Sequence, residues 1–265
     1  MKWSELETKR TYFLYFILIW LAYRFWGSTL FSQLGETAIQ SPGIDNTFWF
    51  FNLLGIPKLM THHSFIAALA DVLLLFIPLL LLKKWNKWLS ILLTLLLTIY
   101  YITYATFACH HVHSLVALIF VSIIFWTKDA LLQKRLMEAV RYYFLFAMSS
   151  AAIWKLARGS VFEVNHLSTI LSHQHAQWMT DYPNGMMTTF YQYLIQNTTV
   201  SYTLYLSAIM LELAFLEGFF TKKSDRLIAI LFITFIGFNY LIMGVFSFEL
   251  LPFLLVLEIN PKSER

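Results

Sequence analysis

The chain alternates between long apolar runs and short segments that hold most of its basic residues. An α-helix needs about 20 mainly apolar residues to cross the hydrocarbon core of a bilayer. We predict seven such spans, at residues 12–31, 64–82, 88–107, 111–126, 138–158, 203–220 and 227–246. An eighth apolar segment, residues 248–259, is short for a full crossing and is expected to tilt or to lie partly at the interface. The pattern predicts an all-α, polytopic transmembrane bundle of seven or eight spans.

Composition supports a membrane protein. The 265 residues are 58% hydrophobic and 13% charged, whereas soluble domains carry about 25% charged residues. We expect one transmembrane domain over residues 1–265 with no soluble domain. The basic residues lie in short loops between apolar runs, so the net charge of +4 reflects membrane topology. The expected partner is the lipid bilayer, a lipophilic small molecule is possible, and no nucleic acid is expected.

The distribution of basic residues predicts the orientation. If the N-terminus is cytoplasmic, all of the 19 basic residues except Arg24, Lys58, Lys155 and Arg158 fall in cytoplasmic segments or at their edges. This is the asymmetry that the positive-inside rule describes. The small size and the absence of a soluble domain favour a bacterial inner membrane.

The same topology places all 8 histidines on the non-cytoplasmic side. They fall in three outer segments: His62 and His63; His110, His111 and His113; and His166, His173 and His175. Two of these segments, residues 27–63 and 159–202, are long and rich in aromatic and apolar residues. We expect their amphipathic stretches to form a cap over the outer end of the bundle. The histidines either mark a functional site there or simply suit an interface.

Lys155 is the most informative single residue. It lies about one turn from the outer end of the fifth span, where a lysine costs free energy unless it pairs or reaches the headgroups. Arg158 shares its helix face. A nearby cation and a dry setting would favour a neutral amine, which could act as a general base. The alternative is that Lys155 snorkels to the outer headgroups.

Other polar residues in the apolar spans are candidates for the same site. Asp71, Glu212 and Glu217 are expected to be intramembrane carboxylates, with Arg24 as the partner of one of them; a structural ion pair is the alternative. Asn239 is expected to form hydrogen bonds within the bundle. His110 and His113, which can share a helix face, and the His-x-His pattern of His173 and His175 are weak candidates for metal binding, beside acid–base or interfacial roles.

These residues resemble the transmembrane domain shared with vitamin K-dependent gamma-carboxylases, the horizontally transferred transmembrane (HTTM) domain. Residues 12–257 follow its general pattern. His111 matches the histidine that opens the fourth helix, Lys155 the lysine of the fifth, and Glu212 the acidic residue of the sixth. Asn239 and Gly244 match the motif of the seventh helix, but its histidine is replaced by Ile236.

The resemblance implies that Lys155 is a catalytic base and that His111 assists it, with a reduced, vitamin K-like quinone as cofactor. His110, His113, Arg24, Glu212, Asn239 and Arg158 would support the pocket. The chain lacks the large soluble region of the carboxylases, so recognition of a protein substrate is not implied. We therefore expect either a carboxylase-like or lyase-type membrane enzyme, or a non-catalytic membrane partner in peptide maturation or export, or a permease subunit.

Overall fold

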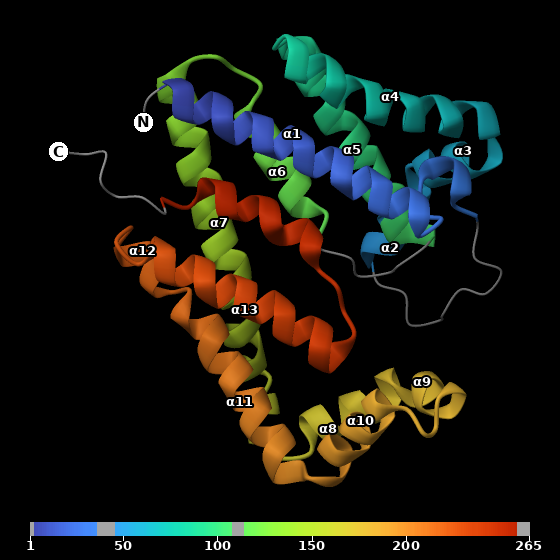
Figure 1. The fold of residues 1–265 in the computed structure, drawn as a ribbon, viewed down its shortest axis with the longest axis vertical. Coiled ribbons are helices and arrows are strands. Elements are labelled where there is room, and N and C mark those ends of the chain that lie inside the picture. Colours follow the sequence, from blue (N-terminus) through green and yellow to red (C-terminus); the bar gives the residue numbers. More distant parts are fainter. Residues whose placement is uncertain (1–2, 36–45, 108–113, 259–265) are drawn as a thin grey trace. The chain divides into compact units, whose positions relative to one another are not determined.

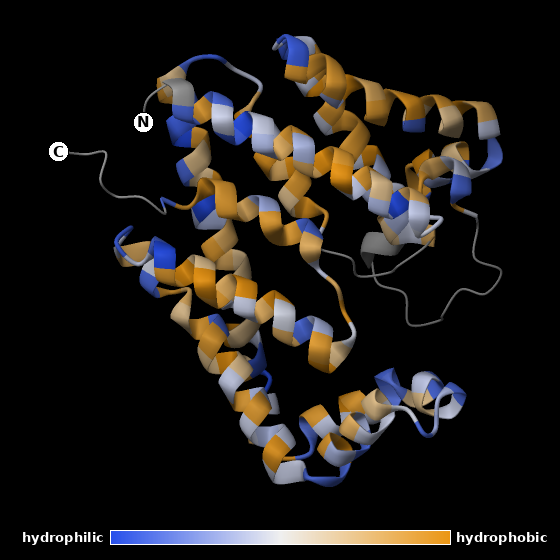
Figure 2. Ribbon diagram, in the orientation of Figure 1, coloured by the Kyte–Doolittle hydropathy of each residue, from blue (hydrophilic) through white to orange (hydrophobic). Residues whose placement is uncertain are grey.

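Long helices joined by short turns make up the computed structural model, which describes residues 3–35, 46–107 and 114–258 (Figure 1). No strand occurs among these residues. Five helical segments are long and apolar enough to cross a membrane: Glu5–Gln33, Ser64–Lys83, Lys87–Phe107, Thr198–Phe220 and Asp225–Met243. Figure 2 shows hydrophobic residues along the long helices and hydrophilic residues near many of their ends. The chain is thus an all-helical, multi-pass membrane protein.

The chain divides into two compact units, and the boundary falls within the long helix α7 (Ala130–Ala157). Unit 1 comprises Met1–Val140 and Glu249–Val256, and unit 2 comprises Arg141–Phe248 and Leu257–Arg265.

Unit 1 is built on α1 (Trp3–Trp26), α4 (Ser64–Lys83), α5 (Lys87–Phe107) and α6 (Val116–Ile124). Helix α4 packs on α1 and α5, and α6 packs on α5 and α1. The shorter elements are η1 (Phe31–Gln33), α2 (Asn46–Leu53) and α3 (Ile56–His62), of which α2 and α3 pack on α5. The 3-10 helix η3 (Phe248–Val256) completes the unit.

Asp71 has a structural role in unit 1. Its Oδ1 accepts a hydrogen bond from the backbone N–H of Phe31 at 3.0 Å, and its Oδ2 accepts one from Ser32 at 2.9 Å. The first N–H groups of a helix have no partner within the helix, and Asp71 supplies two acceptors to the start of η1. This carboxylate therefore holds η1, the short helix that follows α1, against α4.

Unit 2 contains most of α7 together with α11 (Thr198–Ala214), α12 (Glu217–Phe220) and α13 (Asp225–Met243). The segment between α7 and α11 forms η2 (Ser160–Phe162), α8 (His166–Gln174), α9 (Ala176–Asp181) and α10 (Met186–Gln196). Helix α8 packs against α10, α11 and α13. A buried apolar cluster that includes Ala152, Leu171, Leu194 and Ile209 joins these elements.

The ends of the unit 2 helices show how the chain passes through it. Arg141, at the start of the unit 2 part of α7, donates to both carboxylate oxygens of Asp225, the first residue of α13. At its other end, α7 is joined through the short helices to the start of α11. Side chains of α8 and α10 bond the last carbonyls of α13, so α8 and α10 lie at the C-terminal end of that helix. Helices α7, α11 and α13 therefore run in alternating directions.

Three expected spans differ from what is described. Of the fourth, only α6 and its flanking residues from Ser114 onward are described. The fifth lies in a helix that begins earlier than expected, at Ala130, and this helix is not among the five that are long and apolar enough to cross a membrane. The eighth is a 3-10 helix with Pro252 inside it, which lacks an N–H for a regular helix.

Candidate functional site

Lys155 and Glu212 form an ion pair in unit 2. The Lys155 Nζ donates to Glu212 Oε1 at 2.6 Å and to Oε2 at 2.8 Å. Helix α7 supplies the lysine from its last turn, and α11 supplies the glutamate from its last turn. The glutamate side chain is only 3% exposed and the lysine side chain is 31% exposed. The pair therefore has one buried member and one that is accessible.

This pairing changes the chemistry expected of Lys155. A carboxylate at hydrogen-bond distance stabilises the charged form of a lysine. The neutral amine expected from the sequence took into account only a nearby cation and a dry setting, and the structure adds a carboxylate at hydrogen-bond distance. An ammonium has three N–H donors, and Glu212 occupies two of them. The third N–H is left for another acceptor on the accessible side of the pair.

A line of polar contacts continues from the end of α7. Ser160 Oγ donates to the Lys155 carbonyl at 3.1 Å and lies 2.7 Å from the Tyr205 hydroxyl. Since the one proton of Ser160 serves that carbonyl, Tyr205 is the donor to Ser160. The ring of His166 lies 4.9 Å from the ring of Tyr205 and its Nδ1 is 3.0 Å from Glu163 Oε2. His166 therefore lies beside the site, which the sequence did not indicate.

Arg158 does not join the pair. Its guanidinium carbon lies 4.5 Å from the centre of the Trp154 ring, a cation–π contact on the exposed face of α7. Although Arg158 is three residues from Lys155, their side chains contact different partners. Among the described residues, the contact of Arg158 with Trp154 does not link it to the pocket that it was predicted to support.

His175 caps the end of α13. Its buried ring places Nε2 2.9 Å from the Ile242 carbonyl and stacks on Tyr191 at 3.7 Å. A carbonyl only accepts, so Nε2 carries a proton. The Tyr191 hydroxyl bonds the Leu241 carbonyl at 3.4 Å, and burial raises the pKa of that hydroxyl. The positive φ of Gly244, +64°, ends the helix here, and an added Cβ would lie 3.3 Å from the His175 ring.

The structure gives no metal site among the residues it describes. His173 is exposed on α8 and His175 is engaged as a cap. No group of three or more His, Cys, Asp or Glu side chains within residues 3–35, 46–107 and 114–258 could hold an ion. His110, His111 and His113 lie outside the described residues, so the predicted contact between Lys155 and His111 is not among those described.

Arg24 has a different partner from the three carboxylates expected. It bonds Glu249 of η3 in unit 1, and both side chains are almost fully buried. The Tyr104 ring centre lies 4.2 Å from the Arg24 guanidinium carbon. Pairing with Asp71, Glu212 or Glu217 was the wrong prediction, because Asp71 caps η1, Glu212 binds Lys155 and Glu217 is exposed on α12.

Asn239 is half-buried near the end of α13, and its backbone carbonyl accepts from the Val245 N–H at 3.3 Å. Ile236, where the resemblance expects a histidine, is 6% exposed. In this part of α13, the Asn239 carbonyl therefore takes part in ending the helix, and Ile236 packs in the apolar interior.

Sequence reasoning missed two residues that bind charges in the described part of the chain. Glu249 was treated as part of a short apolar segment, and Asp225 as part of a loop. A signal was available, because a charge within an apolar segment requires an opposite charge nearby. Arg141 lacked an assigned partner and Arg24 was assigned to other carboxylates. Matching both to the acidic residues beside apolar runs would have suggested Asp225 and Glu249.

Comparison with known proteins gives no relative from which a role could be transferred: no family model, no curated protein and no solved structure matches the chain.

Proposed function

We propose that this protein crosses the bilayer seven or eight times, with its N-terminus in the cytoplasm and the end of α7 that carries Lys155 on the other side. The distribution of basic residues supports this orientation. The short helices α8, α9 and α10 fit an outer cap, since they contain both apolar and polar residues and α8 and α10 bond the end of α13. A bacterial inner membrane is the proposed location.

We further propose that Lys155 and Glu212 form an acid–base site at the outer side. The observation that carries this proposal is the asymmetry of the pair, in which a buried carboxylate stands behind a lysine that is 31% exposed. An ion pair that served only to hold helices together would not need a side chain that solvent or substrate can reach. Intramembrane ionisable groups also mark proton and substrate sites more often than passive structure.

The pair can accept a proton in two linked steps. Lys155 passes a proton from Nζ to a Glu212 oxygen across the 2.6 Å bond, and the resulting neutral amine takes a proton from the substrate. The net change is a protonated Glu212, an ammonium at Lys155 and a substrate anion beside that ammonium. The positive charge of Lys155 then stabilises the anion where it forms. Glu212 is thus the final proton acceptor, not only a support.

The proposed substrate or cofactor is lipid-soluble and carries an acidic hydroxyl, as a reduced quinone does. The resemblance to the HTTM domain supports this class, because a lysine at the position of Lys155 is the base in that domain. The hydroxyl oxygen of a reduced quinone would accept the third N–H of Lys155, and rotation of the neutral amine about its Cε–Nζ bond would then turn its lone pair to the weakly acidic hydroxyl proton. Within this proposal the enzyme is of the carboxylase-like or lyase type, and His111 assists Lys155.

The test uses the full chain in phosphatidylcholine nanodiscs with vitamin K hydroquinone under air. We expect hydroquinone consumption above that of empty nanodiscs, a loss of that excess in Lys155→Met and Glu212→Gln, and no loss in Lys58→Met. Lys58 is the matched control, a lysine predicted to lie on the same side of the membrane. Equal rates in the wild type and Lys155→Met would overturn the acid–base proposal for this substrate class.

One observation favours a second candidate, a non-catalytic membrane partner in peptide maturation or export, or a permease subunit. Both oxygens of Glu212 are bonded by Lys155, which is also how an ion pair fastens two helices. In that case Lys155→Arg keeps the thermal stability and Lys155→Met lowers it, while no variant changes hydroquinone consumption.

A further inference from the structure

Two helices of unit 1 are too short to cross a membrane and yet present large apolar side chains. Helix α2 has 8 residues and α3 has 7, so they are about 12 and 10 Å long, against about 30 Å for a hydrocarbon core. Lys58 is the only charged residue between positions 46 and 62 of the sequence. Large apolar side chains grouped on a surface mark a contact with a protein or a membrane. Those exposed on α2, α3 and the turn between them are Trp49, Phe50, Leu53, Leu54 and Leu59.

A ring contact between α2 and α5 gives the depth of this surface. Helix α5 has 21 residues, a length of about 31 Å, so it just spans a hydrocarbon core of about 30 Å. The centre of the Phe51 ring lies 5.8 Å from that of Tyr101. Tyr101 lies six residues before Phe107, the last residue of α5, and this is about 9 Å along the helix. Helices at a membrane interface are buried by about 5–10 Å, and α2 therefore lies at their depth.

The exposed side of α4 continues the same surface. Helix α4 is long and apolar enough to cross a membrane, so its exposed apolar side chains, among them Phe65 and Phe76, meet lipid. Helix α3 packs on α4 and on α5, and His63 alone separates α3 from α4 along the chain (Figure 1). Lipid beside the start of α4 is therefore also beside α3.

The turn between α2 and α3 forms hydrogen bonds within its own backbone. The N–H of Leu54 donates to the Phe50 carbonyl at 3.2 Å, and the N–H of Gly55 donates to the Asn52 carbonyl at 3.2 Å. The Gly55 carbonyl accepts the N–H of Leu59 at 3.0 Å, and the positive φ of Gly55, +68°, lets the chain reverse here. Backbone groups that meet lipid must be hydrogen-bonded within the protein. These three N–H groups fulfil that condition.

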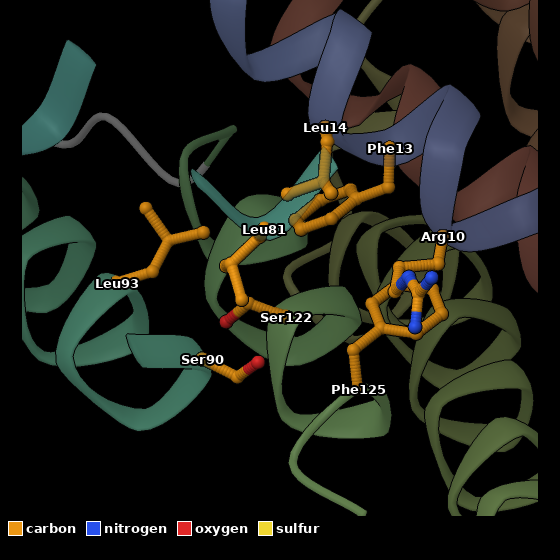
Figure 3. A pocket seen from close by; sticks show the side chains of 8 residues that line it. All are labelled: Arg10, Phe13, Leu14, Leu81, Ser90, Leu93, Ser122 and Phe125. Atoms are coloured by element: carbon orange, nitrogen blue, oxygen red, sulfur yellow. The ribbon is translucent and has the colours of Figure 1, made fainter. Parts of the chain in front are cut away.

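The crevice in Figure 3 is no alternative place for lipid in unit 1. It lies at the opposite ends of α4 and α5, where Leu81 of α4 faces Ser90 and Leu93 of α5. Its cavity volume is about 10 Å³, which is room for about one water molecule. An acyl chain does not fit there, so lipid contacts unit 1 on its outer surface.

We propose that α2 and α3 lie within one lipid leaflet, on the side of the membrane where α1 ends, with Trp49, Phe50 and Leu53 against the acyl chains of phospholipids. Lys58 is exposed on α3, and its long stem can bring the ammonium to the headgroup phosphates. The two helices thus anchor unit 1 in the leaflet, whereas the sequence led us to expect an outer cap from residues 27–63. Either orientation of the chain in the membrane gives the same contact.

The experiment places single cysteines in the full chain with Cys109→Ala, in phosphatidylcholine nanodiscs, whose two faces are both open to reagents. We expect Leu53→Cys to react with a water-soluble maleimide at least about tenfold more slowly than Lys87→Cys, because apolar surroundings disfavour the reactive thiolate. Without lipid the two positions would react alike, since Leu53 is 84% exposed and Lys87 is exposed at the start of α5. A bimane fluorophore on Leu53→Cys should be quenched by brominated acyl chains as strongly as one on Phe76→Cys, the lipid-facing control.

Two outcomes would overturn the inference. If Leu53→Cys reacts as fast as Lys87→Cys, α2 lies in water. If Leu53→Cys reacts slowly but bromine does not quench its fluorophore, protein rather than lipid covers this surface, either another part of the chain or a second copy. If Leu53→Cys fails to fold, Leu54→Cys carries the test with the same expected results, because Leu54 is also exposed.

Discussion

Arg141 and Asp225 meet inside unit 2, with side chains that are 2% and 0% exposed. The Arg141 Nε lies 3.1 and 3.0 Å from the two carboxylate oxygens. The Arg141 Nη2 donates to the Gly218 carbonyl at 2.9 Å, and Asp225 Oδ2 accepts the Glu258 N–H at 2.8 Å. One guanidinium thus ties α7 to the turn between α12 and α13.

Removal of Arg141 should strongly destabilise unit 2. Arg141→Met leaves the Asp225 carboxylate buried without a counter-charge, which costs about 3–5 kcal/mol. Arg141→Lys should recover only part of this loss, because an ammonium lacks the planar, forked N–H donors with which a guanidinium binds both oxygens of a carboxylate. Thermal unfolding in detergent measures both. Arg135→Met, on the exposed side of the same helix, is the control, and an equal loss in the two methionine variants would contradict the assigned role of the pair.

Gly218 is fixed by close packing. A Cβ there would lie 2.6 Å from Leu145 Cδ2 and 2.7 Å from Ile228 Cδ1. Gly218→Val should lower stability by about 1–3 kcal/mol, the usual effect of overfilling a packed core. Gly237→Val on α13 is the control, since an added Cβ there meets nothing within 4 Å. The two variants are compared by the ratio of folded to aggregated protein after a heat step. Equal ratios would argue against tight packing at Gly218.

His175 should hold the end of α13. His175→Ala removes both the bond to the Ile242 carbonyl and the stack on Tyr191, and the loss of one hydrogen bond costs about 1 kcal/mol. Faster hydrogen exchange is expected in the last turn of α13, with little change in the middle of the helix. His173→Ala, an exposed neighbour on α8, should leave exchange unchanged. A uniform increase over the whole helix would instead indicate global destabilisation.

The proposed orientation predicts which positions react from outside the cell. In a Cys109→Ala background, a cysteine at exposed Asn184 should react with a membrane-impermeant maleimide on intact cells. A cysteine at exposed Lys87 should react only after the membrane is opened. The reverse pattern would invert the topology and place Lys155 on the cytoplasmic side.

The long apolar helices could be predicted from the sequence because a bilayer imposes one simple length and composition on each crossing. Residues 64–82 and 88–107 were expected to span, and α4 and α5 lie at Ser64–Lys83 and Lys87–Phe107. The pairing of charges could not be predicted in the same way. Lys155 and Glu212 are 57 residues apart, and Arg141 and Asp225 are 84 apart, so their contacts depend on how helices pack rather than on local pattern.

The segment at residues 248–259 was expected to be apolar but short for a full crossing, and the structure forms the 3-10 helix η3 there. Its backbone is set by Pro252 and by Glu249, which turns inward to Arg24. One buried charge thus outweighs the preference of several apolar residues for a longer helix.

The bond between Arg24 and Glu249 has a consequence for biogenesis. The two residues are 225 positions apart, and a ribosome adds about 5–20 residues per second. The first helix therefore stays in the membrane for about ten seconds or more with an uncompensated guanidinium before its acidic partner is synthesised. During that interval the nascent chain depends on the insertion machinery or on lipid to shield the charge.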